Sequence, residues 1–135
     1  MYMENKYKYT KTTVSMVNYH IVFCPRYRRK IFRIPGVEQR FKELTMEGCR
    51  NNDIDIIAMK CRDDHVHLFI SVYPQLSIPD AVRMVKGFTS YELRKEFKEL
   101  SEMPSLWTRS YFVSTAGAVS SEVVQWYVET QKKRG

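Results

Sequence analysis

The segment that most restricts the fold runs from residue 53 to residue 73, where two runs of strand-forming residues, DIDIIAMKC and HVHLFISVY, flank the three residues RDD. Two such runs joined by so short a turn predict a β-hairpin. The second strand opens with His65 and His67, whose side chains point to one face while Val66 points to the other. Strand histidines often make only structural hydrogen bonds, so the pair is either a packed polar pair or half of a metal site.

Secondary-structure signals on both sides of the hairpin give the order strand, helix, strand, strand, helix, strand, helix. Pro25 ends the first strand, and Ser77, Pro79 and Asp80 predict the capped first turn of the second helix. Apolar residues at helical spacing predict the helices. The expected elements are strand 14–24, helix 37–51, strand 53–61, strand 65–73, a helix from Ser77 to about Phe97, strand 107–117, and a closing helix at 119–133 capped by Ser120 or Ser121.

The first six of these elements are the split βαβ order. They predict a ferredoxin-like α+β fold, an antiparallel sheet with helices on one face, to which the closing helix is added. No linker or internal repeat divides the chain, so residues 14–135 are interpreted as a single domain. Residues 1–13 are polar and rich in lysine and are interpreted as a flexible basic arm.

Charge and cysteine content narrow the class of partner and the compartment. The chain has 22 Lys and Arg against 15 Asp and Glu, a net charge of +7, which favours a nucleic acid first and an anionic membrane surface second. Three cysteines without a C-x-x-C pair argue against a disulfide framework or a zinc ribbon and fit a reducing cytoplasm. Neither a signal peptide nor a membrane-length apolar run is present, so we expect a cytoplasmic protein without a membrane partner.

The closing helix carries residues that could react with a nucleic acid. Tyr127 and Gln131 are four apart and share one helix face. Tyrosine is a candidate nucleophile, and the glutamine carbonyl oxygen could complete a cation site begun by His65 and His67. These positions alone leave open whether Tyr127 packs in the core and Gln131 is solvated.

Such a ligand set leaves positions open on the ion, as a catalytic site requires. Mg²⁺ or Mn²⁺ would suit the donors, with Asp63 and Asp64 as supporting partners or an extra ligand. A tyrosine that attacks a DNA phosphodiester conserves the bond energy in a phosphotyrosine link. The absence of a G-x-x-x-x-G-K-[ST] loop agrees with chemistry that needs no nucleotide cofactor.

Four segments in this order and spacing resemble one family: NYHIVFCPRYRRKIF, DDHVHLFI, LWTRSYFVSTAG and WYVETQ. They resemble the single-tyrosine HUH transposases (TnpA type) of the smallest bacterial insertion sequences. The resemblance implies a ferredoxin-like homodimer that depends on Mg²⁺ or Mn²⁺ and cleaves single-stranded DNA beside a hairpin. It makes His65, His67 and Gln131 the metal ligands and Tyr127 the nucleophile that takes the 5′-phosphate, in a site that two subunits can share. The alternative is a non-catalytic or host-adopted protein that binds single strands or hairpins.

Basic residues mixed with aromatic ones are candidates for contacts with phosphates and unstacked bases. His20 is expected to pack or to face DNA rather than bind a metal, and Trp107 and Trp126 are expected in the core. The candidate DNA contacts are Arg26, Arg28, Arg29 and Lys30 after the first strand, and Lys132 and Lys133 beyond the tyrosine.

Overall fold

The computed structural model describes residues 16–115 and 121–133. The predicted arm at residues 1–13 therefore lies outside the described residues. Short 3₁₀ turns, η2, η3 and η4, join or extend the main elements. In chain order the elements are β1 (Val17–Phe23), η2 (Arg26–Arg28), η3 (Ile31–Arg33), α1 (Val37–Asn51), β2 (Asp55–Arg62), β3 (His65–Val72), α2 (Ile78–Glu96), α3 (Lys98–Ser101), β4 (Phe112–Thr115), α4 (Ser121–Thr130) and η4 (Gln131–Lys133).

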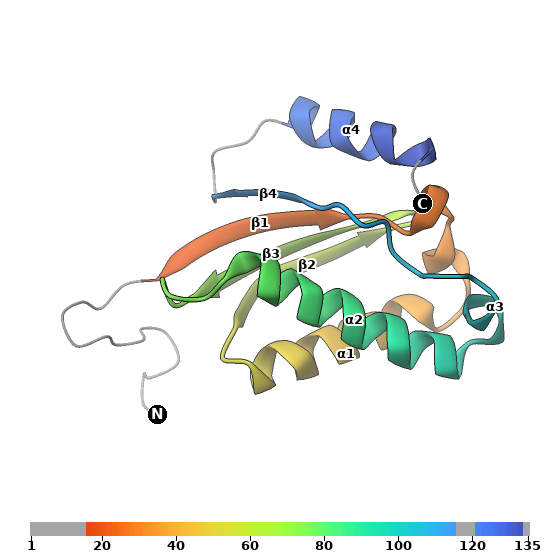
Figure 1. The fold of residues 1–135 in the computed structure, drawn as a ribbon, viewed down its shortest axis with the longest axis horizontal. Coiled ribbons are helices and arrows are strands. Elements are labelled where there is room, and N and C mark those ends of the chain that lie inside the picture. Colours follow the sequence, from red (N-terminus) through yellow and green to blue (C-terminus); the bar gives the residue numbers. More distant parts are fainter. Residues whose placement is uncertain (1–15, 116–120, 134–135) are drawn as a thin grey trace.

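The four strands form one sheet in the order β2-β3-β1-β4, and every neighbouring pair is antiparallel. Helices α1 and α2 lie together on one face of this sheet, while α4 crosses the opposite face (Figure 1). The strand order and the placement of α1 and α2 on one face confirm the predicted ferredoxin-like α+β fold, and the additional C-terminal helix is also confirmed. No helix in the described ranges is both long and apolar enough to span a bilayer.

Strand β1 supplies side chains to both faces of the sheet, because successive residues of a strand point in opposite directions. Ile21 and Phe23 lie in the main core beneath α1 and α2. Val22 and Cys24 lie in a smaller cluster on the other face, where α4 covers them. The sheet is therefore packed on both faces, and α4 is held by an apolar contact of its own.

The helices follow local signals in the sequence. Helix α1 has the predicted bounds, 37–51, and its buried side chains include Phe41 and Leu44. The Ser77 hydroxyl accepts a hydrogen bond from the backbone N–H of Asp80 at 3.3 Å, so the predicted N-cap of α2 is confirmed. Helix α2 then continues through Gly87 without interruption.

The strand predicted at 107–117 was placed too early, because β4 begins at Phe112. Trp107 is instead buried in the main core, as expected, where its indole N–H donates to the Thr89 hydroxyl at 3.1 Å. The carbonyls of Thr108 and Ser110 accept hydrogen bonds from the Lys86 ammonium at 2.6 and 3.0 Å. Lys86 therefore binds two carbonyls between residues 108 and 110, and the pairing of β4 with β1 starts only at Phe112.

The start of the closing helix and its cap at 119–120 fall outside the described residues, and α4 ends at Thr130 before the η4 turn. The prediction that Trp126 lies in the core is wrong, because its side chain is 66% exposed. The helix is rotated so that Tyr127 and Val128 face the sheet instead.

Candidate metal and nucleophile site

His65 and His67 lie on the face of β3 that is turned away from the main core. His67 is directly opposite Val22 of β1 in the antiparallel register, and directly paired residues point to the same side. The histidines therefore share the sheet face that α4 covers. Their ring centroids are 5.0 Å apart, with an interplanar angle of 68°.

His65 is oriented by a carboxylate. Its Nδ1 lies 2.9 Å from Oδ1 of Asp64, and the other carboxylate oxygen of Asp64, Oδ2, lies 2.7 Å from a terminal nitrogen of the Arg28 guanidinium. Burial raises the pKa of the Asp64 carboxyl, but hydrogen bonds from His65 and Arg28 outweigh this and lower the pKa below 3.8. The ionised carboxylate can only accept, so the Nδ1 of His65 carries the proton in this contact.

His67 is oriented by a third histidine. Its Nδ1 lies 3.0 Å from Nε2 of His20, and the His20 ring stacks on Phe69 with centroids 4.2 Å apart. Burial, followed by the positive charges of neighbours including His65, lowers the pKa of His67 to about 4. Burial also lowers the pKa of His20. His20 therefore packs against His67 and Phe69, which is one of its two expected roles. Sequence spacing alone gave no sign of these contacts.

The two imidazoles have the donor chemistry of a divalent-cation site. Each uses Nδ1 in a hydrogen bond to a partner, and this is how most metal-binding histidines are oriented so that Nε2 binds the ion. Two rings that bind one ion at a metal–nitrogen distance of about 2.1 Å hold their centroids roughly 4.6 to 5.3 Å apart, for bond angles between about 90° and 109°. The observed 5.0 Å lies within this range, so the spacing of the two rings is compatible with a shared cation.

Among the described residues, no three His, Cys, Asp or Glu side chains are grouped so that they could hold a metal ion. A third ligand from this described part of the chain would have to be of another kind, such as the amide oxygen expected from Gln131.

Tyr127 and Gln131 lie on the sheet-facing side of α4 and η4. Tyr127 is 7% exposed and packs with Val22 and Cys24, and Gln131 is 2% exposed. The hydroxyl of Ser110 lies 3.1 Å from the Tyr127 hydroxyl and donates to Oε1 of Gln131 at 3.0 Å. Because a serine has one proton to donate, the tyrosine donates to the serine oxygen. Ser110 thus binds both of the oxygens that sequence analysis selected on this helix.

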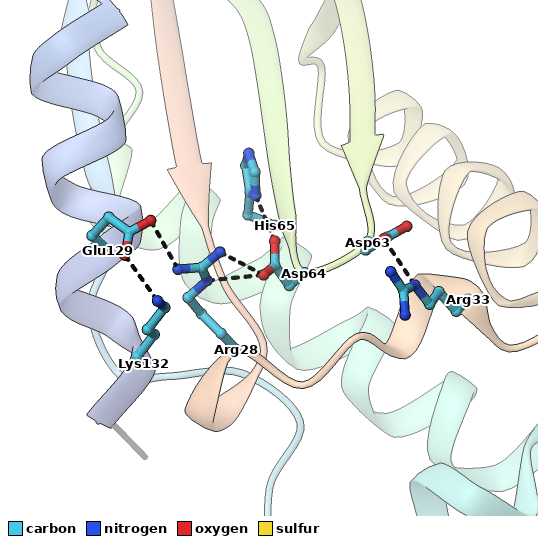
Figure 2. Close-up of polar contacts among 7 residues, drawn as sticks. All are labelled: Arg28, Arg33, Asp63, Asp64, His65, Glu129 and Lys132. Carbon is cyan, nitrogen blue, oxygen red and sulfur yellow. Dashed lines mark hydrogen bonds and ion pairs between the residues drawn. The ribbon is translucent and has the colours of Figure 1, made fainter.

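An ion-pair chain connects α4 to the histidine end of β3. Arg28 contacts Asp64 through two of its nitrogens and Glu129 of α4 at 3.5 Å, and Glu129 in turn pairs with Lys132 at 3.1 Å (Figure 2). The carboxylates of Asp64 and Glu129 approach Arg28 from different elements. Arg28 therefore joins the turn before β3 to the tyrosine helix.

The other predicted DNA contacts differ in accessibility. Arg29 and Lys30 are exposed, whereas Arg26 is half-buried and donates to the Ser105 hydroxyl at 3.1 Å. Lys132 is exposed, and the Lys133 side chain lies outside the described part of the chain. None of these contacts is tested by the structure, and they remain predictions.

Two basic residues that sequence analysis did not select lie beside the histidines. Lys60 and Arg62 of β2 pair directly with His67 and His65 in the register, so they point to the same sheet face. Both are exposed. The alternation of β2 could have identified them only after its register with β3 was known.

A ferredoxin-like sheet with a histidine pair on one face and a tyrosine-bearing helix across that face defines the class of single-tyrosine transposases. The family model described as "Transposase IS200 like" matches residues 13–131. The chain belongs to this family.

Comparisons with individual proteins agree with the family assignment. The chain is 30% identical over 121 residues to the ISDra2 transposase TnpA of Deinococcus radiodurans, covering 87% of this chain and 86% of that one. It is 30% identical over 117 residues to the transposase for insertion sequence element IS200 of Salmonella typhimurium, covering 84% and 75%. A crystal structure of a transposase from Deinococcus radiodurans R1 superposes with a TM-score of 0.84 at 27% identity, covering 92% and 97%.

A more distant solved structure shares the fold. It is a REP-associated tyrosine transposase bound to a REP hairpin, with a TM-score of 0.54 and 12% identity, covering 90% of this chain and 68% of that one.

Proposed function

We propose that this transposase cleaves and rejoins single-stranded DNA at hairpin-flanked element ends through a 5′-phosphotyrosine intermediate on Tyr127. The observation that carries the proposal is the orientation of the histidine pair, with both Nδ1 atoms hydrogen-bonded on the sheet face that the tyrosine helix covers. A divalent cation, Mg²⁺ or Mn²⁺, held by His65 and His67 with Gln131 would polarise the scissile phosphate.

In the proposed cleavage step, the Tyr127 oxygen forms a bond to phosphorus while the bond from phosphorus to the 3′-oxygen breaks. The phenol proton is lost to solvent, and the departing oxygen gains a proton to become a 3′-hydroxyl. Rejoining is the reverse, with a 3′-hydroxyl attacking the phosphotyrosine. The phenol must leave Ser110 to reach the phosphate, so the step requires a local movement of the tyrosine side chain or its helix.

The exposed Lys60 and Arg62 beside the histidines support binding of the DNA strand on this face. Each phosphate that such residues neutralise on a single strand lowers the logarithm of affinity by about 0.7 per tenfold rise in salt. The REP-hairpin complex of the distant relative supports a hairpin ligand for this chain as well. We further propose a homodimer in which Tyr127 serves the histidine pair of its own or of the other subunit.

The decisive experiment incubates the protein with a labelled oligonucleotide that contains the hairpin and flank of its own element, in Mg²⁺ or Mn²⁺. We expect a covalent adduct that denaturing gels resolve, and its loss in Tyr127→Phe, in His67→Ala and after EDTA. Tyr91→Phe is the matched control, because Tyr91 is a 64% exposed phenol on α2, away from the histidine face, and its loss leaves the adduct unchanged.

Measurements of DNA affinity and of the oligomeric state separate the remaining alternatives. A protein that binds DNA without an adduct in either metal would instead be the non-catalytic or host-adopted binder, and its affinity would not change in Tyr127→Phe. Light scattering during gel filtration measures the mass, and mixing Tyr127→Phe with His67→Ala protein tests whether two defective subunits restore one shared site.

A further inference from the structure

We propose that His20 is a positioning residue that sets the tautomer of His67, so that the Nε2 of His67 can bind a cation. The inference rests on the proposed metal site and assigns a role to a residue that the four matching motifs left without one. It follows from one contact, the 3.0 Å approach of His20 Nε2 to His67 Nδ1.

A hydrogen bond between two ring nitrogens needs one proton and one lone pair. If His20 donates, His67 is left with its proton on Nε2, the atom on the side where a cation would bind. If His67 donates from Nδ1, its Nε2 keeps a lone pair, and His20 accepts with its own proton on Nδ1. Only the second arrangement gives His67 the form that binds a metal, and the hydrogen bond at the other nitrogen sets this choice.

The surroundings of His20 hold it in place for this contact. The side chain is 8% exposed, and its ring stacks on Phe69 with an interplanar angle of 12°. The His20 and His67 rings lie edge to edge and nearly coplanar, with centroids 5.3 Å apart and an interplanar angle of 23°, as a hydrogen bond in the plane of the rings requires. The ring therefore has little freedom to leave His67.

The arrangement mirrors that of His65, whose Nδ1–H donates to a carboxylate. Asp64 and His20 thus perform equivalent tasks for the two ligands, one with a charged acceptor and one with a neutral acceptor. Because partners of this kind usually change metal affinity by about 10- to 100-fold, the same range applies to His20.

The test uses three variants. His20→Phe keeps an aromatic ring against Phe69 but has no acceptor, whereas His20→Gln restores an acceptor through its side-chain oxygen. Phe69→Leu is the packing control, since it removes the stacking partner and leaves His20 and His67 in place.

The first measurement is long-range ¹H–¹⁵N NMR of the histidine rings in EDTA-treated protein. We expect the His67 proton on Nδ1 in the wild type, in His20→Gln and in Phe69→Leu, and a shift toward Nε2 in His20→Phe. A proton on Nε2 in the wild type, or an unchanged Nδ1 proton in His20→Phe, would overturn the inference.

The second measurement is Mn²⁺ affinity by calorimetry. His20→Phe should bind Mn²⁺ about 10- to 100-fold more weakly than the wild type, while His20→Gln and Phe69→Leu stay within a few-fold. Equal weakening in His20→Gln, which restores an acceptor, would show that packing of the His20 ring alone is responsible and would refute the role of the acceptor. If the wild type binds no Mn²⁺, the metal proposal fails, and the NMR experiment still decides the tautomer.

Discussion

Arg28 and Arg33 offer a direct comparison of a shielded ion pair with an exposed one. Arg28 and Asp64 have side chains that are 16% and 11% exposed, whereas Arg33 and Asp63, next in sequence to Asp64, are 62% and 52% exposed (Figure 2). The contact distances are nearly equal, 2.7 and 2.8 Å. Arg28 also has a second nitrogen on Asp64 and a further contact with Glu129, so a difference in stability between the two pairs reports burial together with these additional contacts.

Arg28→Met removes the charge and leaves Asp64 shielded from water. Removing one partner of a buried pair costs about 3 to 5 kcal/mol, and the remaining exposure, together with the hydrogen bond from His65, reduces the expected loss here to about 2 to 3 kcal/mol. Arg33→Met should lower the free energy of unfolding by no more than about 1 kcal/mol, because an exposed ion pair contributes little. Methionine is chosen because Arg28 has a φ of 52°, and glycine there would relieve backbone strain and obscure the result.

Urea denaturation measures both variants and the double-mutant cycles with Asp64→Asn and Asp63→Asn. At a slope of about 2 kcal/mol per molar urea, the Arg28→Met midpoint falls by roughly 1 to 1.5 M. The ionised Asp64 contributes stability above its unfolded pKa of 3.8, so the Arg28 contribution shrinks as the pH falls below that value. Equal losses in the two methionine variants would refute the argument.

Three further predictions concern other parts of the fold. Gly87→Ala should raise the free energy of unfolding by about 0.5 to 1 kcal/mol in urea denaturation, because an added Cβ in α2 meets no atom within 4 Å apart from the adjoining helix backbone. A loss of stability would contradict this. Lys86→Met should lower the free energy of unfolding by about 1 to 3 kcal/mol in the same assay, because the carbonyls of Thr108 and Ser110 lose the ammonium that donates to them. An unchanged urea midpoint would mean that water replaces the ammonium as donor. In EDTA-treated protein the free energy of unfolding should fall by roughly 1 to 2 kcal/mol from pH 7 to pH 4, because the folded state lowers the pKa of His67 from 6.5 to about 4. The partial exposure of the ring screens the effect and keeps the change this small. A His67→Gln variant should lose less stability over this range.

Features that depend on neighbours in the chain could be predicted from the sequence. The apolar spacing of α1, the Ser77 cap and the 53–73 hairpin involve residues close together, and all three are confirmed. The order of the elements was then sufficient for the fold class, because few arrangements bury the apolar faces of such a series.

Features set by tertiary contacts could not be predicted. Both Trp126 and Tyr127 belong to stripes that could face a sheet, and only the packing of α4 on Val22 and Cys24 selects the tyrosine. His20 and His67 are 47 residues apart, and their contact depends on the register of β1 with β3. The site residues themselves were chosen from motif and chemistry, and their catalytic roles stay predictions until the adduct is measured.

The two-sided packing of β1 limits how this sequence can change during evolution. Ile21 and Phe23 fill one core, while His20, Val22 and Cys24 serve the opposite layer. Inserting or deleting a single residue inside the strand would exchange these two sets, so that the imidazole of His20 would face the main core and the phenyl ring of Phe23 would face the layer of the histidine pair. Substitutions that preserve size and polarity can accumulate along β1, but the number of residues in the strand cannot change. Insertions and deletions in functional descendants should therefore be confined to the connections outside the strand.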